Sequence, residues 1–386
     1  MMYRPTAAAL CGLAAFGLAA CDTADGPSAA PETATGVFDA ALFPDADQLI
    51  ATSNRPDALD QDRVVRYRSP DALGRAATFF RERDYDVVSF QSSLFFEQTT
   101  DYYATFDIAS GTGGRVARFD RRGNQLAVND VSLIDPKGLS AFSFNLVFVA
   151  DIGQSGVPFF DASSLMAVGE LNEPGASNWD FHADDNSALV FGAGTDGFVN
   201  VYAGPGDPAD RFQVLDVNGS PAVNLHGITY DADTQTLIVS DVGLAGSADD
   251  GAIHVLDYAP FEDGRIDPEF GDSGPNAGTP IQARATYMGA NTMLGNPVDI
   301  AGSNADLFVA EKANSGGMVM RFADVLTATG MQNVAPVATS SLANPESVDA
   351  IDQSAIGGGP DGPGPGPGPG GEVPLRTTSP WAAWGK

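Results

Sequence analysis

The segment LIVSDVGLAGSADDGAIHVLD, residues 237–257, contains the pattern that decides the fold. A short apolar run ends in Asp241, a loop rich in Gly and Asp follows, and a second run alternates apolar and polar residues. Alternation with a period of two residues is typical of β-strands, and Gly-rich or Asp-rich stretches between such runs form turns. The segment therefore predicts two neighbouring antiparallel strands.

The same pair of runs recurs along the chain. A clear second copy is LFVAE (307–311) followed by MVMRF (318–322). The last residues of the first runs are Ser53, Asp107, Asp151, Gly194, Asp241 and Glu311, and the spacings between them are 54, 44, 43, 47 and 70 residues. Most of these spacings are close to the roughly 40 to 50 residues of a four-stranded propeller blade. The long last interval contains an insertion near residues 261–278 that is rich in Asp, Glu, Gly and Pro.

A third piece precedes several of these pairs, and it consists of a small residue or Pro, an apolar residue and often Asp. It occurs at residues 137–141, 226–231 and 296–300, and once more at 344–349, after the last pair. The first pair, which begins at Leu49, has no convincing copy before it. We therefore expect the C-terminal piece to supply the innermost strand of the first blade. Such a closure removes an open sheet edge and sets the number of blades at six.

The expected fold class is therefore all-β: a six-bladed β-propeller of four-stranded antiparallel blades at residues 45–355, closed by a C-terminal strand that joins the first blade. A short helix is predicted only in DALGRAATFFRERDY (71–85), with Asp71 as its cap. Residues 356–386 contain a Gly–Pro alternation that buries no apolar surface, and this predicts a disordered tail.

The N-terminus has the features of an export signal. Arg4 precedes an apolar stretch at residues 6–20, which is too short to span a bilayer comfortably. The stretch ends in LAAC (18–21), which looks like a bacterial lipobox; the alternative is a plain secretory signal. We expect residues 1–20 to be a lipoprotein signal peptide, Cys21 to be diacylated, and residues 21–44 to be a flexible tether. Two acyl chains would anchor the protein stably to a membrane.

These features predict a bacterial cell-envelope location with the folded domain outside the cytoplasm. The outer membrane is favoured over the inner membrane. Asp22 directly follows the lipidated Cys, an inner-membrane retention signal in enterobacteria, but that rule does not extend to every phylum.

Composition excludes several functions. The chain has 386 residues, of which 43% are hydrophobic, so a large core is possible. It carries 50 acidic and 20 basic residues, a net charge of −30, and this excludes nucleic acid as a partner because phosphate binding requires clustered Lys or Arg. The two cysteines are Cys11 and Cys21, and Cys11 lies in the removed segment. The mature chain therefore has no disulfide, cysteine metal site or cysteine nucleophile.

The repeats resemble NHL repeats and the related six-bladed propellers of the gluconolactonase and regucalcin kind, over roughly residues 45–353. The resemblance implies radial sheets around a central channel, with the innermost strands starting at one mouth. Similar hydrolases hold a divalent metal there with Asn, Asp and Glu from different innermost strands. Matching the repeats places the following residues around that mouth: Lys137, Ser177 or Asn178, His226, Asn296 and Glu346.

Two functions remain open. The chain has no nucleophile elbow, P-loop, dinucleotide fingerprint or zinc-protease helix, which favours a non-catalytic, monomeric, lipid-anchored protein that binds or scaffolds a protein, glycan or small molecule. The loops at residues 243–251 and 261–278 are expected to form its binding face. The alternative is a metal-dependent hydrolase of the lactonase or esterase type.

In the hydrolase, His226, Asn296 and Glu346 would hold Ca²⁺ or Zn²⁺ in the channel and activate water, with Lys137 and Asn178 lining the channel. His226 and Lys137 depart from the Glu, Asn and Asp ligand set of the resembling hydrolases. Surface aspartates such as those at residues 231–233 are a further, structural option for Ca²⁺.

Overall fold

The computed structural model describes residues 48–351, with gaps at residues 55–61, 68–72, 75–76, 83–85, 96–98, 108–112, 121–123, 143, 176, 245–248 and 304. The predicted signal peptide, tether and tail, and Cys21 with them, lie outside the described residues. Within the described ranges, no helix is long and apolar enough to cross a membrane.

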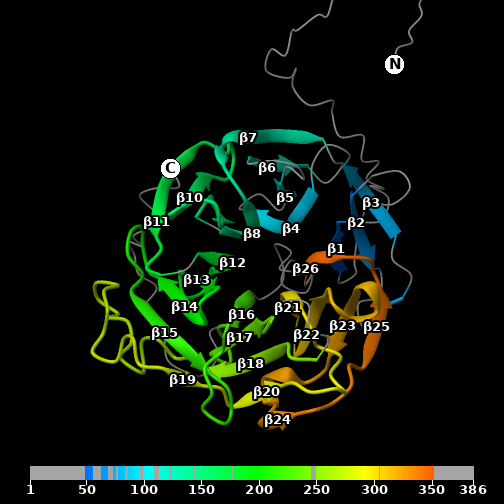
Figure 1. Ribbon diagram of the computed structural model, residues 1–386. Coiled ribbons are helices and arrows are strands. Elements are labelled where there is room, and N and C mark those ends of the chain that lie inside the picture. Colours follow the sequence, from blue (N-terminus) through cyan, green and yellow to red (C-terminus); the bar gives the residue numbers. More distant parts are fainter. Residues whose placement is uncertain are drawn as a thin grey trace, which may run out of the picture. The chain divides into compact units, whose positions relative to one another are not determined.

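Six antiparallel β-sheets form a ring of blades (Figure 1), which confirms the predicted six-bladed propeller. The strands of the first three blades are as follows, from the innermost strand outward. Blade 1 contains β26 (Pro345–Ile351), β1 (Gln48–Ser53), β2 (Asp62–Tyr67) and β3 (Ala77–Glu82). Blade 2 contains β4 (Asp86–Phe95), β5 (Thr99–Asp107), β6 (Gly114–Phe119) and β7 (Gln125–Leu133). Blade 3 contains β8 (Pro136–Phe142), β9 (Leu146–Asp151), β10 (Gly156–Asp161) and β11 (Ala167–Asn172).

The other three blades include two extra strands. Blade 4 contains β12 (Asn178–Asp184), β13 (Leu189–Gly194), β14 (Phe198–Tyr202), β15 (Asp210–Leu215) and β19 (Ile281–Gln282). Blade 5 contains β16 (Leu225–Asp231), β17 (Thr236–Asp241), β18 (Ala252–Asp257), β20 (Ala285–Tyr287) and β24 (Gly330–Gln332). Blade 6 contains β21 (Pro297–Ser303), β22 (Asp306–Glu311), β23 (Met318–Phe322) and β25 (Ala338–Ser341). The fifth strands, β19 and β24, pair in parallel with the outer strands β15 and β20.

The ring is closed as the sequence predicts. β26 pairs antiparallel with β1, so that Leu49 lies opposite Ala350 and Ala51 lies opposite Val348. The Ser347 amide also donates to Thr52 Oγ1 over 2.9 Å. The C-terminal strand therefore completes the first blade, and the edge of β1 is covered.

Six clusters of buried apolar side chains hold the ring together, and each lies between two neighbouring blades. Between blades 1 and 2, for example, Phe80 is buried with its ring centroid 5.4 Å from that of Phe119 and 6.2 Å from that of Phe90. Burial of a side chain of this size stabilises the fold by about 1.5–3 kcal/mol. A blade can bury its apolar faces only against its neighbours, which is why the strand pairs form a closed ring.

The acidic residue that ends the second strand of several blades has a structural role that accounts for its recurrence in the sequence. The carboxylates of Asp151, Asp241 and Glu311 accept hydrogen bonds from backbone N–H groups of the loop that leads into the innermost strand of the same blade. The donors are Ile134 and Asp135, Val223 and Asn224, and Gly295 and Asn296, respectively. Each carboxylate also accepts from the loop that follows it, where the donors are Gly153, Gly243 and Ala313. The recurring acid thus fixes both loops of its blade.

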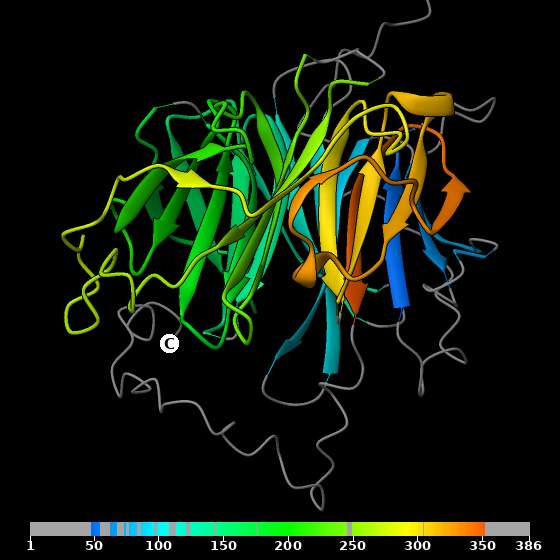
Figure 2. The ribbon, with the colours of Figure 1, turned by 90° about the horizontal axis from the view of Figure 1, so that it is seen from below.

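The innermost strands run roughly along the ring axis (Figure 2) and all begin at the same face of the ring, which we name the leading face. Because strands in a blade alternate in direction, the second strand of each blade ends at the leading face, and the loop after Asp241 lies there. β18 ends at the opposite face, so the insertion at residues 261–278 starts from that side. It is attached there by Arg265, whose Nε donates to Asp210 at the start of β15. The prediction that both loops form one face is wrong.

The predicted helix at residues 71–85 is also wrong. Its described central part, residues 77–82, forms β3 and pairs with β2, with Phe80 opposite Val64. Pairing completes the outer edge of blade 1 and buries Phe80 against blade 2, and this tertiary packing outweighs the helical propensity of the segment. Among the described residues, the helical elements are two short 3₁₀ turns, η3 (Asn314–Gly316) and η4 (Val325–Thr327).

Candidate functional site in the central channel

Every innermost strand has a β-bulge just after it begins. The register shifts lie between Pro136 and Leu139 in β8 and between Leu225 and Ile228 in β16, and the other four innermost strands have equivalents. The residues outside the regular pairing are Val88, Lys137 and Gly138, Trp179, His226 and Gly227, Val298, and Glu346 and Ser347. A bulge redirects the side chain of the extra residue. The structure therefore places Lys137, His226 and Glu346 at equivalent positions near the leading mouth of the channel.

An aromatic stack with a lysine beside it lies at this mouth. The rings of Trp179 and His226 are parallel within 9°, with centroids 3.8 Å apart. Lys137 Nζ lies 5.5 Å from the Trp179 ring centroid, in the range of a cation–π contact. The same ammonium group is paired with Asp135 and, over 3.3 Å, with Asp107.

Glu346 is paired with a lysine that sequence reasoning missed. Its carboxylate forms an ion pair with Lys312, whose backbone N–H donates to the Asn296 carbonyl oxygen over 3.0 Å. Burial raises the pKa of Glu346, while the charges of Lys312 and Lys137 oppose that rise. Lys312 directly follows Glu311, the anchoring acid of its blade, so its place at the mouth could have been inferred from the repeat.

The other two predicted metal ligands have unsatisfied polar atoms. His226 is 7% exposed, and its Nδ1 has no hydrogen-bond partner in the described part of the chain; the same holds for the buried Oδ1 of Asn296. The pKa of His226 is lowered to about 3, mainly by burial; the charge of Asp241 opposes this shift, and the charges of Lys312 and Lys137 contribute to it. The imidazole is therefore neutral at neutral pH.

The donor set does not fit a divalent cation as it is arranged. The two ammonium groups that lower the pKa of His226 would repel a cation, and the carboxylate of Glu346 is already used by Lys312. No three His, Cys, Asp or Glu side chains in the described ranges form a group that could hold a metal ion. The metal site at His226, Asn296 and Glu346 remains a prediction.

Asn178, the other predicted channel residue, is directed into its blade. It is fully buried, its backbone N–H and Nδ2 donate to Glu173 over 2.7 and 2.8 Å, and its Oδ1 accepts from Asn200. Burial raises the pKa of Glu173 to about 7. The adjacent Trp179 lines the narrow part of the channel instead.

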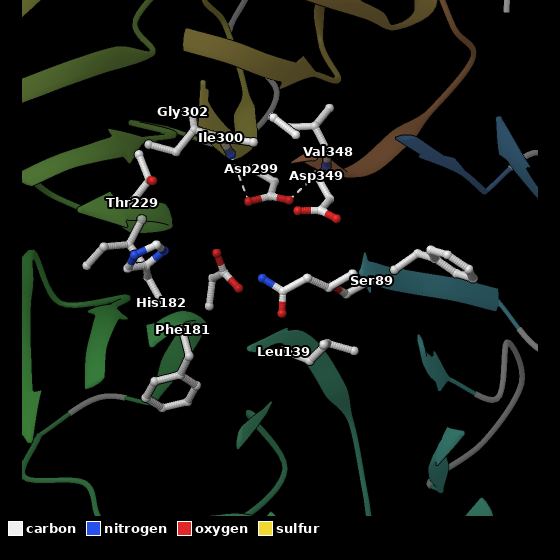
Figure 3. A pocket seen from close by; sticks show the side chains of 16 residues that line it. Ser89, Leu139, Phe181, His182, Thr229, Asp299, Ile300, Gly302, Val348 and Asp349 are labelled. Atoms are coloured by element: carbon white, nitrogen blue, oxygen red, sulfur yellow. Dashed lines mark hydrogen bonds between the residues drawn. The ribbon is translucent and has the colours of Figure 1, made fainter. Parts of the chain in front are cut away.

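Below the mouth the channel widens into a cavity of about 200 Å³ (Figure 3). All six innermost strands contribute to its wall, and the polar lining residues are Ser89, Gln91, Asp180, His182, Thr229, Asp299 and Asp349. A narrower space of about 10 Å³, lined by Trp179 and Glu346 among others, shares Asp180 and Asp299 with the cavity. These two aspartates therefore lie between the leading mouth and the cavity.

Sequence reasoning missed Asp180 and Asp299 as channel residues. Their signal was present, because an acidic residue often follows the apolar residue of the third recurring piece, and each aspartate comes directly after its bulge.

The comparisons with known proteins bear on the fold alone. No protein-family model and no curated protein matches the chain. A chain in a crystal structure of a nidogen/laminin complex is similar, with a TM-score of 0.51 and 11% identity over 79% of this chain and 97% of that chain. Since 1084 chains of solved structures match, the fold is widespread and does not by itself select a function. The similarity supports a six-bladed propeller, whereas the NHL and gluconolactonase resemblance is not confirmed.

Proposed function

We propose that this chain is a lipid-anchored protein of the bacterial cell envelope whose propeller binds a macromolecular partner through its leading face. The observation that carries the binding role is the exposure of apolar side chains there. Val223 is 57% exposed and Leu244 is 74% exposed. The loops that contain them are both fixed by Asp241, which accepts from the Val223 and Gly243 amides. Exposed apolar groups lose water favourably when a partner covers them.

A photo-crosslinking experiment tests the binding role. A photoreactive amino acid replaces Leu244 on the leading face or, as the control, Met166, which is 68% exposed in the loop between β10 and β11 at the opposite face. We expect a discrete adduct on intact cells from position 244 and none from position 166. Adducts from neither position, or the same adducts from both, would refute binding at the leading face.

The lipid anchor is supported by the LAAC sequence at residues 18–21. Cells that express wild type, Cys21→Ala or the control Cys11→Ala are labelled with a palmitate analogue, and their membranes are then separated on a density gradient. We expect label in wild type and Cys11→Ala, an unlabelled and soluble Cys21→Ala protein, and wild type in the outer-membrane fraction. Labelled Cys21→Ala protein would contradict lipidation at this residue.

A metal-dependent hydrolase is the second candidate. It is motivated by the unsatisfied Nδ1 of His226 and Oδ1 of Asn296, and it requires Glu346 to exchange its ion pair with Lys312 for a metal ion. Thermal unfolding of the purified full chain with and without millimolar Ca²⁺ or Zn²⁺ tests it, together with the metal content of the protein. A bound metal that is lost when His226 and Glu346 are both changed to Ala would favour the hydrolase. If no metal co-purifies or stabilises the protein, the hydrolase is excluded.

A further inference from the structure

The channel is narrow near the leading mouth and wide beyond it. Beside Trp179 and Gly138 its free space is only about 10 Å³, which holds about one water molecule. The cavity of about 200 Å³ extends along the innermost strands as far as Gly302, an exposed residue near the end of β21, and Ala350 near the end of β26. The wider route into the cavity is therefore from the face opposite the leading face.

The wall of this cavity carries negative charge without a matching positive charge. Asp180, Asp299 and Asp349 line it, and no Lys or Arg is among its lining residues. In Figure 3 the carboxyl groups of Asp299 and Asp349 and the imidazole ring of His182 border the same space. The whole chain has a net charge of −30, so the surrounding field has the same sign as the cavity. Such a field raises the local concentration of cations.

Asp180 and Asp299 are the buried members of this group, with exposed fractions of 8% and 9%. The Asp299 carboxylate accepts hydrogen bonds from the amides of Ile300 over 2.7 Å and Val348 over 2.9 Å, and these bonds fix its orientation. In the described part of the chain, neither aspartate forms an ion pair with a basic side chain. A buried carboxylate without a counter-charge is costly, and a bound cation offsets that cost.

The dimensions of the cavity suit an organic cation better than a metal ion. Among the described residues, no three His, Cys, Asp or Glu side chains are grouped so that they could hold a metal ion. A volume of about 200 Å³ is also much larger than one ion, since a protein cavity of about 150 Å³ accommodates benzene. The hydroxyl groups of Ser89 and Thr229 supply further acceptors in the wall. Carboxylates and hydroxyls together match the three donors of an ammonium group on a body about as large as benzene.

We propose that the central cavity is a binding site for a small organic cation, whose ammonium group pairs with Asp180 of blade 4 and Asp299 of blade 6. Asp349 adds to the negative field of the site. The ligand enters from the face opposite the leading face, so this site goes beyond the macromolecular partner proposed above and is separate from it. Because the two aspartates belong to different blades, the bound cation also stabilises the folded ring.

Three probes that share one body and differ in charge test this site: benzylammonium, benzyl alcohol and benzoate. Each is titrated into the full chain by calorimetry at about pH 8, at which carboxyl groups are ionised and primary amines keep their proton. We expect benzylammonium to bind with a dissociation constant below about 1 mM, and the other two probes to bind at least about tenfold more weakly. No binding of benzylammonium at millimolar concentration, or equal binding of benzyl alcohol, would overturn the proposal.

A pair of variants separates a site from a general effect of charge. Asp180→Asn removes one carboxylate of the site, and Asp233→Asn makes the same change of charge at an exposed position in the loop between β16 and β17, at the opposite face. We expect benzylammonium to bind at least about tenfold more weakly to Asp180→Asn and with unchanged affinity to Asp233→Asn. Equal affinities for the two variants would show that the net charge of the protein, and not the cavity, attracts the probe.

A variant that fills the cavity without changing its charge is an independent test. Gly302 lines the cavity (Figure 3), and a Cβ atom there has its nearest contact, Thr229 Oγ1, at 3.5 Å, an ordinary van der Waals distance. Gly302→Leu therefore introduces an apolar side chain beside the site at little steric cost. We expect its denaturant midpoint to stay near that of wild type while benzylammonium binds at least about tenfold more weakly. Undiminished binding to this variant would place the probe outside the cavity and overturn the proposal.

Discussion

Removal of the closing strand is the most direct test of the fold. A chain that ends after Asn344 lacks β26, so β1 loses its partner on the channel side and five positions of pairing, from Gln48 to Ser53, disappear. Asp299 loses the amide of Val348 as well. A chain that ends after Ile356 is the matched control, because it lacks the Gly–Pro tail but keeps the whole of β26.

The size of the effect follows from these contacts. With a net value of about 1 kcal/mol for each hydrogen bond, loss of the ladder and of the Val348 amide costs about 4–6 kcal/mol. Exposure of the buried Val348 side chain and of its neighbours on β1 adds about 2 kcal/mol. The sum is comparable with the entire stability of an ordinary domain, about 5–15 kcal/mol.

Thermal unfolding followed by far-UV circular dichroism measures the difference between the two truncated chains. At about 2 °C or more for each kcal/mol, the chain that ends after Asn344 should unfold at least about 10 °C below the control, if it folds at all. Hydrogen exchange should show the largest loss of protection in β1. Equal midpoints for the two chains would refute the conclusion that β26 completes the first blade.

Two further predictions concern packing and buried charge. Gly227→Ala places a Cβ atom 2.6 Å from the Ile300 backbone nitrogen and should lower the free energy of unfolding by about 1–3 kcal/mol or more. Gly302→Ala, whose Cβ atom has its nearest contact at 3.5 Å, should change that free energy little. Equal denaturant midpoints for the two variants would contradict this prediction. Asp210→Asn removes the carboxylate that pairs with the buried Arg265 guanidinium over 2.7 Å and should cost about 3–5 kcal/mol. Limited proteolysis should then cut first within the insertion at residues 261–278, and an unchanged cleavage pattern would count against that role.

The regular part of the fold could be predicted from sequence because each strand carries its own signal. Apolar runs that end in Asp151, Asp241 and Glu311 are the second strands of their blades, and the residue that ends each run holds the adjoining loops. The closure was predictable for the same reason. The third recurring piece at residues 344–349 has no strand pair after it, and the first strand pair has no such piece before it, so the two were expected to pair. Local pattern and tertiary demand agree at these positions.

The channel chemistry was less predictable, because it depends on which side chains meet across the ring. Asp180 and Asp299 are 119 positions apart in the chain, and no local pattern shows that both line the same channel cavity. Lys312 was missed because the family resemblance assigns its partner Glu346 to a metal. The segment at residues 71–85 has helical propensity, but the need of β2 for a partner determines the structure of residues 77–82.

The pairing of β1 with β26 also determines when the chain can complete its fold. Thr52 and Ser347 are hydrogen-bonded across 295 positions of sequence, so the first blade has only three strands until nearly the whole chain has been synthesised. Contacts of such long range form late and slowly. A ribosome that stops early, or a protease that trims the polypeptide before residue 345, leaves an exposed strand edge, and the cell's chaperones and proteases can recognise the defect before the protein reaches its destination.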